Sequence, residues 1–117
     1  MSQPLNMQRV FGVHEPALAL HARRLELITG NLANADTPGY VPRDLDFAKA
    51  LTAAGDAPLD LDAAQFERYA SQPSVDGNRV DLPREQAAFA DAALHYQASL
   101  NFLESRVRGL LTAITGQ

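Results

Sequence analysis

The sequence predicts an all-α fold, an antiparallel coiled-coil pair of N- and C-terminal helices with a largely irregular middle segment. The main observation is that an apolar stripe with a 3.5-residue repeat occurs near each end of the chain. A second is the length of 117 residues, which is enough for one domain. Within that domain we expect an N-terminal helix and loop in residues 1–40, a short helix and an extended or partly disordered connector in 41–80, and a long helix in 81–117.

The C-terminal helix is expected to run from Pro83 to Ile114. Asp81 suits its N-cap, Pro83 its first turn, and Gly116 the left-handed residue just past its end. At about 1.5 Å per residue it is roughly 48 Å long. Its apolar and small residues alternate spacings of 4 and 3, which predicts a seam for a partner helix along Phe89, Ala93, Tyr96, Leu100, Leu103, Val107, Leu110 and Ile114.

A second helical pattern begins at Pro16. Its seam has the same period and includes Leu18, His21, Leu25, Ile28, Leu32 and Ala35. We interpret His21 as a neutral histidine in the helix interface. This seam spans about 27 Å, so it is too short to cover the C-terminal helix. The apolar stripe continues upstream to Met7, and we therefore expect residues 4–15 to become helical only when a partner covers them.

A dense group of turn-forming residues ends the N-terminal helix. Thr37 precedes proline, which disfavours the helical conformation, and Pro38 and Gly39 suit the central positions of a type II turn. Asparagine amides near the helix end can bind the loop backbone. The pattern predicts a loop with one required shape, made by Asn31, Asn34, Thr37, Pro38, Gly39 and Tyr40.

The middle of the chain has weaker patterns. Residues 44–54 favour one short helix, residues 55–78 show no periodicity, and residues 75–80 resemble a tight turn between short extended arms. A calcium loop beginning at Asp56 is the alternative for the acidic residues here. Its third position would be Pro58 and its sixth, which requires glycine, is Leu61, so we expect a solvated loop.

Composition excludes several classes of function. The net charge is −4 and the ten basic residues are scattered, so no nucleic-acid surface is expected. No secretory signal, transmembrane run or lipid-inserting segment is apparent, and there is no cysteine. We find no phosphate-binding glycine loop and no nucleophile motif, and therefore expect no enzyme activity, cofactor or metal site.

The segment NLANADTPGY, residues 31–40, closely resembles the signature of the bacterial flagellar rod and hook axial protein family. Residues 43–47, 76–82 and 96–103 extend the likeness, which covers 16–47 and 76–116. The short total length resembles the proximal-rod members, which lack the inserted β-rich domain of their longer relatives.

This resemblance implies a structural subunit of the flagellar basal body. It would be exported by the flagellar type III apparatus without a cleaved signal and would polymerise in the periplasm into the proximal rod that transmits motor torque. The implied partners are further copies of itself, rod proteins of the FlgC, FlgF and FlgG type, the rod-base adaptor FliE, and the membrane ring with its export gate. Two alternatives are a free-standing coiled-coil adaptor, which would form a discrete oligomer, and a small helical enzyme or ligand-binding protein, which would need a closed pocket.

Overall fold

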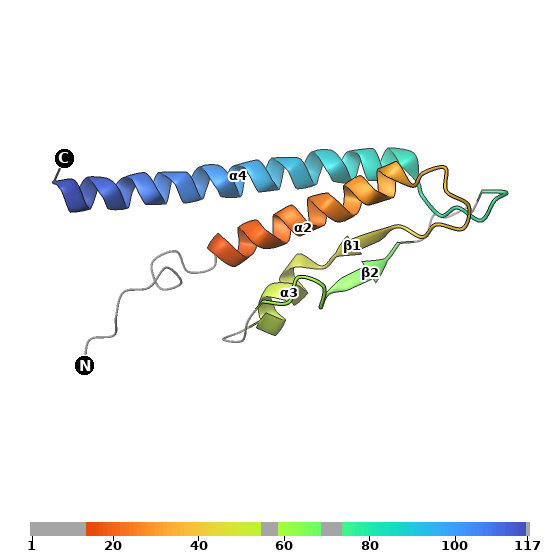
Figure 1. Cartoon of the computed structure of the whole chain (residues 1–117), viewed down its shortest axis with the longest axis horizontal. Coiled ribbons are helices and arrows are strands. Elements are labelled where there is room, and N and C mark those ends of the chain that lie inside the picture. The colour runs from red at the N-terminus through yellow and green to blue at the C-terminus, as the bar shows by residue number, and fades with distance from the viewer. Residues whose placement is uncertain (1–13, 55–58, 69–73, 117) are drawn as a thin grey trace.

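The computed structural model describes residues 14–54, 59–68 and 74–116. In chain order the elements are α2 (His14–Ala33), β1 (Arg43–Leu45), α3 (Phe47–Ala54), β2 (Gln65–Glu67) and α4 (Leu82–Thr115) (Figure 1). The helical majority agrees with the sequence prediction, whereas the two-stranded sheet was not predicted. Most of the segment expected to be conditionally helical, residues 4–13, lies outside the described residues.

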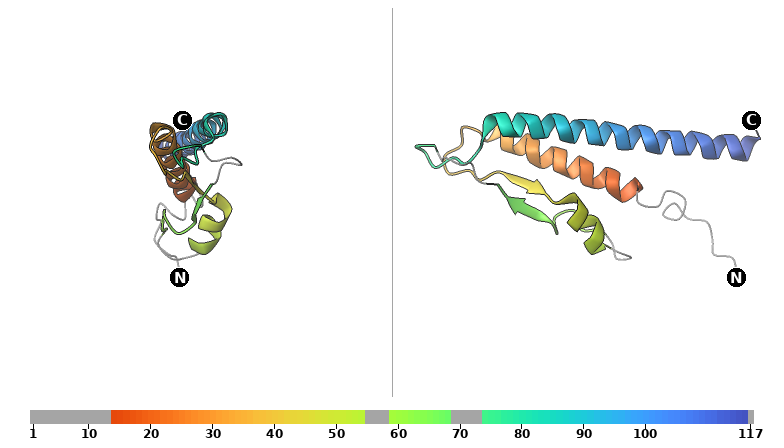
Figure 2. Two further views of the ribbon diagram at one scale, coloured as in Figure 1. Left: turned by 90° about the vertical axis from the view of Figure 1, so that its right-hand side faces the viewer. Right: turned by 180° about the vertical axis from the view of Figure 1, so that it is seen from behind.

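The described elements form three layers with α2 in the middle. α4 runs back alongside α2 in the opposite direction, and the small sheet with α3 lies on the other side of α2 (Figures 1 and 2). Helix α2 is therefore buried on two faces. The sequence indicated only the face that carries the predicted seam, and the coiled-coil geometry of the α2–α4 pair stays a prediction.

The compact core lies between α2 and the sheet layer. Leu20, Leu45, Ala50 and Ala64 are buried together there, and Leu27 packs against them. The two leucines of α2 in this core are seven residues apart and lie outside the predicted seam. The middle segment, which was expected to be largely irregular, thus supplies a layer of its own.

Backbone pairing holds this layer in place. β1 and β2 are antiparallel with Asp44 opposite Phe66, and the Arg68 N–H donates to the Pro42 carbonyl at 2.8 Å. The expected short helix is present as α3. It begins after Asp46, whose side chain accepts from the Lys49 N–H at 3.0 Å and so caps the first turn.

Helix α4 has the predicted ends. The Asp81 side chain accepts from the Arg84 N–H, and Gly116, at φ 73°, donates its N–H to the Thr112 carbonyl at 3.0 Å. Its 34 residues span about 51 Å, against about 30 Å for the 20 residues of α2. No helix in the described part of the chain is long and apolar enough to cross a membrane.

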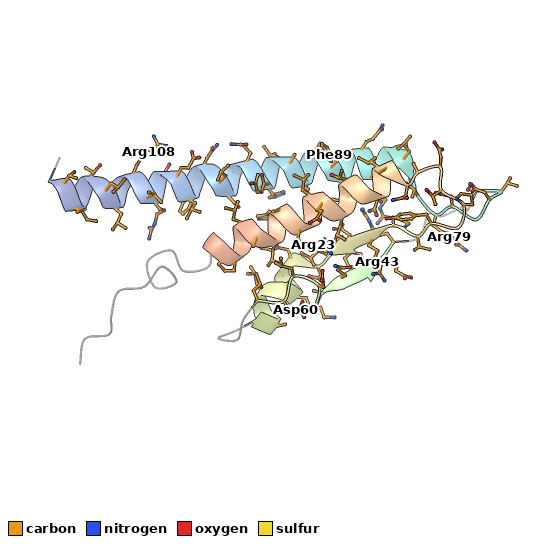
Figure 3. The ribbon with its side chains drawn as sticks, in the orientation of Figure 1. Arg23, Arg43, Asp60, Arg79, Phe89 and Arg108 are labelled. Atoms are coloured by element: carbon orange, nitrogen blue, oxygen red, sulfur yellow. The ribbon has the colours of Figure 1, made fainter. Side chains whose placement is uncertain are left out.

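The difference in length divides α4 into two segments. Residues 82–103, which we call the covered segment, lie beside α2. Residues 104–115, which we call the projecting segment, extend beyond it and are exposed except for the partly buried Leu110. Figure 3 labels Phe89 in the covered segment and Arg108 in the projecting segment.

Candidate assembly site

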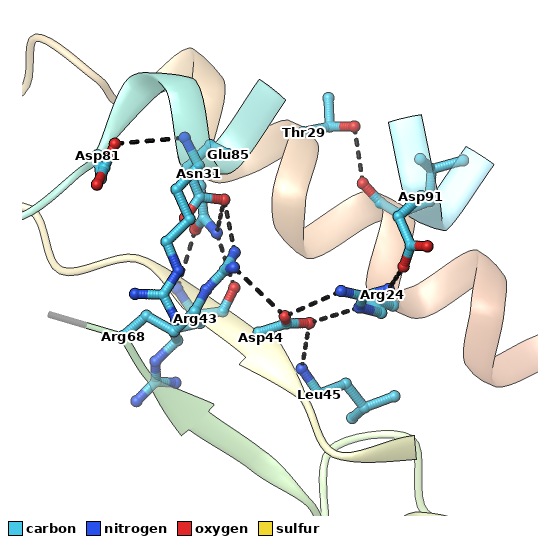
Figure 4. A network of polar contacts seen from close by, with 12 residues as sticks. Arg24, Thr29, Asn31, Arg43, Asp44, Leu45, Arg68, Asp81, Glu85 and Asp91 are labelled. Carbon is cyan, nitrogen blue, oxygen red and sulfur yellow. Dashed lines mark hydrogen bonds and ion pairs between the residues drawn. The ribbon is translucent and has the colours of Figure 1, made fainter. Parts of the chain in front are cut away.

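A buried polar network, which the sequence did not predict, joins α4 to α2 and the sheet (Figure 4). At its centre the Glu85 carboxylate is 1% exposed and accepts hydrogen bonds from Asn31 Nδ2 at 3.0 Å and from Arg68 Nη2 at 2.6 Å. Asn31, fully buried, also donates to the Arg43 carbonyl, while its Oδ1 accepts from the Arg43 N–H and the Tyr40 hydroxyl. Asn31 therefore fixes the end of α2, the loop after it and the start of β1.

The network continues as a chain of alternating charges. Arg68 Nη1 lies 3.6 Å from Asp44 Oδ2, and Arg24 Nε donates to Asp44 Oδ1 at 2.9 Å. Arg24 also donates through Nη1 to Asp91 on α4 at 2.9 Å. This bond from Arg24 holds the pKa of Asp91 below its usual value. Burial opposes the charge on Arg24, but its bonds to Asp44 and Asp91 raise its pKa overall. All three layers are thus tied by paired charges.

Sequence reasoning found only Asn31 and Tyr40 among these residues, because the spacing of the others shows no pattern typical of a site. The contacts join positions far apart in the chain, as when Arg24 meets Asp91. One signal was present: Arg24 and Asn31 are seven residues apart on α2. Polar residues at a heptad spacing beside apolar positions can indicate a polar contact within a helix interface.

The signature loop after α2 has the shape that its residues predict. The Tyr40 N–H donates to the Thr37 carbonyl, and Gly39 has φ 74°, as expected for a turn with Pro38 and Gly39 at its centre. Asn34 Nδ2 donates to the Gly30 carbonyl at 2.8 Å, and the Thr37 hydroxyl donates to Asn34 Oδ1 at 3.0 Å. The asparagine side chains therefore do hold the helix end and the loop backbone.

A second loop, residues 74–80, docks on the first. Asn78 Nδ2 donates to the carbonyls of Asn34 and Thr37 at 3.0 and 2.6 Å, and the Gly39 N–H donates to the Asp76 carbonyl at 3.1 Å. The expected tight turn is present, with Gly77 at φ 79°. We call residues 34–40 and 74–80 together the paired-loop tip. No pattern in the sequence indicated that Asn78, which is buried, joins the two loops.

Three aromatic rings stack beside the network. The His21 ring lies 4.3 Å from that of Phe47 on α3 and 5.6 Å from that of His95 on α4, at interplanar angles of 13° and 18°. Burial, His95 and the Arg24 cation lower the pKa of His21, while Asp91 raises it to a smaller extent. The neutral form is therefore favoured. These rings, with Arg24 and Phe66, line an open groove of about 680 Å³.

The predicted seam residues occupy different environments. On α2, Ile28 is fully buried, and Leu18, Leu25 and Leu32 are partly buried. On α4, the partly buried members are Ala93, Tyr96, Leu100, Leu103 and Leu110, and the exposed members are Phe89, Val107 and Ile114. The most enclosed residues of α4 are Glu85 and Ala92. α2 therefore covers one flank of the predicted α4 seam and leaves the other flank open.

The acidic residues considered as a calcium loop have cationic or turn partners where they are described. Asp62 lies 3.0 Å from the Arg23 guanidinium, and Glu67 lies 3.6 Å from that of Arg43. Asp56 is outside the described residues. Within residues 14–54, 59–68 and 74–116, no group of three or more candidate ligands could hold a metal ion.

Comparison with known proteins gives consistent matches along the chain. A family profile described as "Flagella basal body rod protein" matches residues 11–40, which include α2 and the signature loop. The flagellar basal body rod protein FlgB of Aeromonas hydrophila is 36% identical over 97% of this chain and 98% of its own length. FlgB of Cereibacter sphaeroides is 41% identical over 91% and 94%, and FlgB of Salmonella typhimurium is 37% identical over 87% and 90%.

Proposed function

The chain belongs to the FlgB family of flagellar basal body rod proteins, and on that premise we propose that it polymerises through its N- and C-terminal helices into the proximal rod. Family membership makes it a structural component of the bacterial flagellar basal body rod. The proposal adds how the subunit assembles and that the resulting rod transmits motor torque.

The observation that carries the proposal is the projecting segment of α4. It holds exposed apolar side chains at Val107, Leu111 and Ile114, and in the described structure α2 ends before reaching them. Exposed apolar surface of this extent on a helix is typical of an interaction site. Neighbouring subunits that supply helices here would bury it and build a continuous helical wall.

The buried network gives the subunit the stiffness that a torque-bearing part needs. Five charges alternate from Glu85 through Arg68, Asp44 and Arg24 to Asp91, and they join all three layers. Replacing Arg68 would leave the buried Glu85 without its charged partner, and replacing any other member would remove at least one of a neighbour's ion pairs. We propose that this network holds α4 at a fixed angle to the sheet layer while force passes along the rod.

The paired-loop tip is the second proposed contact. Its backbone is fixed internally, whereas Asp36, Pro38 and Val75 are exposed at the end of the molecule. A rigid loop with exposed side chains can bind an adjacent subunit at little cost in conformational entropy. The signature residues Asn31, Asn34, Thr37, Pro38, Gly39 and Tyr40 would therefore act by shaping this tip.

The remaining parts of the proposal follow the family. The chain would leave the cytoplasm through the flagellar type III apparatus and assemble in the periplasm. Its neighbours would be copies of itself, rod proteins of the FlgC, FlgF and FlgG type, the adaptor FliE, and the membrane ring with its export gate. The subunit would thus have two contact surfaces. Helix α4 would contact neighbouring copies of the same chain, and the paired-loop tip would contact subunits above or below it in the rod.

The test uses the exposed Ile114. Ile114→Asp should leave the free subunit folded, because the side chain is 73% exposed, but should prevent assembly by placing a carboxylate in an apolar contact. The measurement is swimming of a strain that lacks its own copy, together with recovery of the subunit in purified basal bodies. Thr112→Asp adds the same charge to another exposed face of the same helix and should preserve swimming. Normal swimming with Ile114→Asp would show that this segment is not an assembly surface.

The signature loop is tested at Gly39. A Cβ at Gly39 would meet no atom within 4 Å, so Gly39→Val would act through its positive φ alone. We expect Gly39→Val to reduce assembly more than it reduces helix content, whereas Gly39→Asn, which tolerates the left-handed conformation, should assemble nearly normally. Equal assembly of both variants would contradict the role given to the tip.

A further inference from the structure

The open groove beside the charge network is lined by residues from all three layers. His95 comes from α4, His21 and Arg24 come from α2, and residues 44–48 with Phe66 come from the sheet layer; together they surround about 680 Å³. The contacts within the subunit leave the Phe66 side chain 45% exposed. A groove of this kind can enclose a side chain from another molecule on several sides.

Two of the charged side chains in the groove are already paired within the chain (Figure 4). Arg24 donates through Nε to Asp44 and through Nη1 to Asp91, and its Nη2 lies 3.4 Å from Asp44 Oδ2. Asp44 also accepts from the Leu45 N–H at 2.7 Å and lies 3.6 Å from Arg68. Because one arginine stands between two carboxylates, Arg24 adds no net positive charge to the groove.

Asp46 is the third charged side chain of the groove, and it is exposed. Its Oδ1 accepts from the Lys49 N–H at 3.0 Å, whereas among the described residues its Oδ2 has no partner and its carboxylate forms no ion pair. The groove therefore has one carboxylate with capacity to spare. A cation is the ligand that this arrangement favours.

Phe66 lies on the same side of the sheet as this carboxylate. It is directly opposite Asp44 in the β1–β2 pair, so the two side chains share a face. Asp46, two residues further on, continues the ladder by donating its N–H to the Ala64 carbonyl at 2.9 Å, and its side chain falls on that face too. An exposed aromatic ring and an exposed carboxylate thus border one groove.

We propose that this groove receives an arginine side chain of a neighbouring rod subunit, which pairs with Asp46 and stacks on Phe66. A guanidinium suits both groups, because it is planar, lies flat on aromatic rings and binds a carboxylate through two N–H groups, whereas the ammonium of lysine is a point charge. This inference rests on the proposed function. It adds a contact on the sheet layer to those proposed for α4 and the paired-loop tip.

Binding of a small probe to the full chain tests the groove in solution. N-acetylarginine amide is titrated into the chain labelled with nitrogen-15, and the backbone amide signals of residues 46–48 and 66 are followed. We expect a dissociation constant in the millimolar range, and about threefold to fivefold weaker binding of N-acetylcitrulline amide, which has the same shape without the charge. Equal binding of the two probes, or shifts confined to residues outside the groove, would overturn the proposal.

The chain offers matched variants for both groups. Asp46→Asn removes the charge and keeps the cap of α3, because asparagine caps a helix as well as aspartate does. It should weaken binding of the arginine probe about threefold to fivefold, whereas Asp60→Asn, at an exposed acid outside the groove, should have no effect. Phe66→Leu should weaken binding about twofold to fivefold, and Phe89→Leu on α4 is its control. Equal effects of a variant and its control would contradict the role given to that group.

Assembly in cells shows whether the arginine belongs to a neighbouring subunit. In a strain that lacks its own copy, Asp46→Asn should lower recovery of the subunit in purified basal bodies about twofold or more relative to Asp60→Asn, because the contact recurs along the assembly. If Asp46→Asn lost the probe but assembled like Asp60→Asn, a neighbouring subunit would not be the occupant and the proposal would be wrong. Ile114→Asp tests the proposed function separately, since Ile114 lies on the projecting segment and does not line the groove.

Discussion

The two segments of α4 are parts of one unbroken helix in opposite environments. The covered segment contains the buried Glu85 and Ala92 and is joined to α2 and the sheet by the charge network, whereas all residues of the projecting segment are exposed except the partly buried Leu110. Yet the apolar period continues through both. The sequence period therefore shows where a helix needs partners but does not show whether they come from the same chain.

The covered and projecting segments of α4 are therefore expected to have different roles. Substitutions in the covered segment should change the stability of the free subunit, because its buried groups have partners within the chain. Substitutions in the projecting segment should leave the free subunit unchanged and alter assembly alone. Two predictions test this division directly, and two more test contacts that hold the covered segment, α2 and the loops together; they run from the largest expected effect to the smallest.

Glu85→Ala should have the largest effect on stability. It removes the carboxylate that pairs with Arg68 and accepts from Asn31. The buried Arg68 then keeps only Asp44, at 3.6 Å, as a charged partner, and Asn31 Nδ2 keeps only the Arg43 carbonyl. We expect a loss of about 3–5 kcal/mol in the free energy of unfolding, measured by urea denaturation. The control is Glu104→Ala in the exposed projecting segment, which should change it by less than about 0.5 kcal/mol. Similar losses for both would refute the division of α4.

Ala92→Leu tests packing without altering charge. Ala92 is fully buried, so a larger side chain forces its neighbours apart and should cost about 1–3 kcal/mol of unfolding free energy. Ala113→Leu makes the same change at an exposed position of the projecting segment and should be close to neutral. Thermal unfolding of the two variants side by side gives the answer. If Ala113→Leu lowered the free energy of unfolding as much as Ala92→Leu, the projecting segment would be packed in the free subunit.

The comparison also shows which parts of the fold a sequence can predict. Helix limits depended on local signals, and Asp81, Pro83 and Gly116 located both ends of α4 because caps and turns are set by neighbouring residues. The turn at Gly39 was predictable for the same reason. The face of α2 that carries Leu20 and Leu27 was missed, because its partner is a sheet of two three-residue strands, too short to show a period.

The network was beyond prediction for a different physical reason. Its contacts depend on the simultaneous placement of five elements, and a charged side chain such as Arg68 looks the same in sequence whether it is solvated or paired with a buried glutamate. Asn31 was recognised as a loop residue, since its amide can cap a helix, but its bond to Glu85 joins positions 54 residues apart. Local sequence therefore identified Asn31 as a structural residue, but its partner Glu85 becomes apparent only in the folded structure.

Tyr40→Phe should lower the free energy of unfolding moderately, because it removes one hydrogen bond at the paired-loop tip. The hydroxyl donates to Asn31 Oδ1 at 3.1 Å, and that oxygen keeps its second donor, the Arg43 N–H. The expected loss is about 0.5–1.5 kcal/mol, the usual net value of one hydrogen bond. Tyr96→Phe is the control on α4, where no such bond to the network is present among the described contacts. Urea unfolding should rank Tyr40→Phe below Tyr96→Phe in stability, and the reverse order would contradict the hub role of Asn31.

The smallest predicted effect is on the pH dependence of stability. The pKa of His21 is lowered in the folded state by burial, His95 and Arg24, so between its folded and unfolded pKa values the unfolded chain binds more protons. Stability should therefore be complete above pH 7 and should decline as the pH falls below about 6.5, the usual pKa of histidine. His21→Phe keeps a ring against Phe47 but cannot be protonated, so its melting temperature should change less between pH 7.5 and 5.5 than that of the unmodified chain. If the melting temperatures of both proteins changed equally between pH 7.5 and 5.5, His21 would be excluded as the source of the pH dependence of stability. A steeper loss in the variant would mean that protonation at His21 strengthens the contact between α2 and α4, through the carboxylate of Asp91, rather than weakening it.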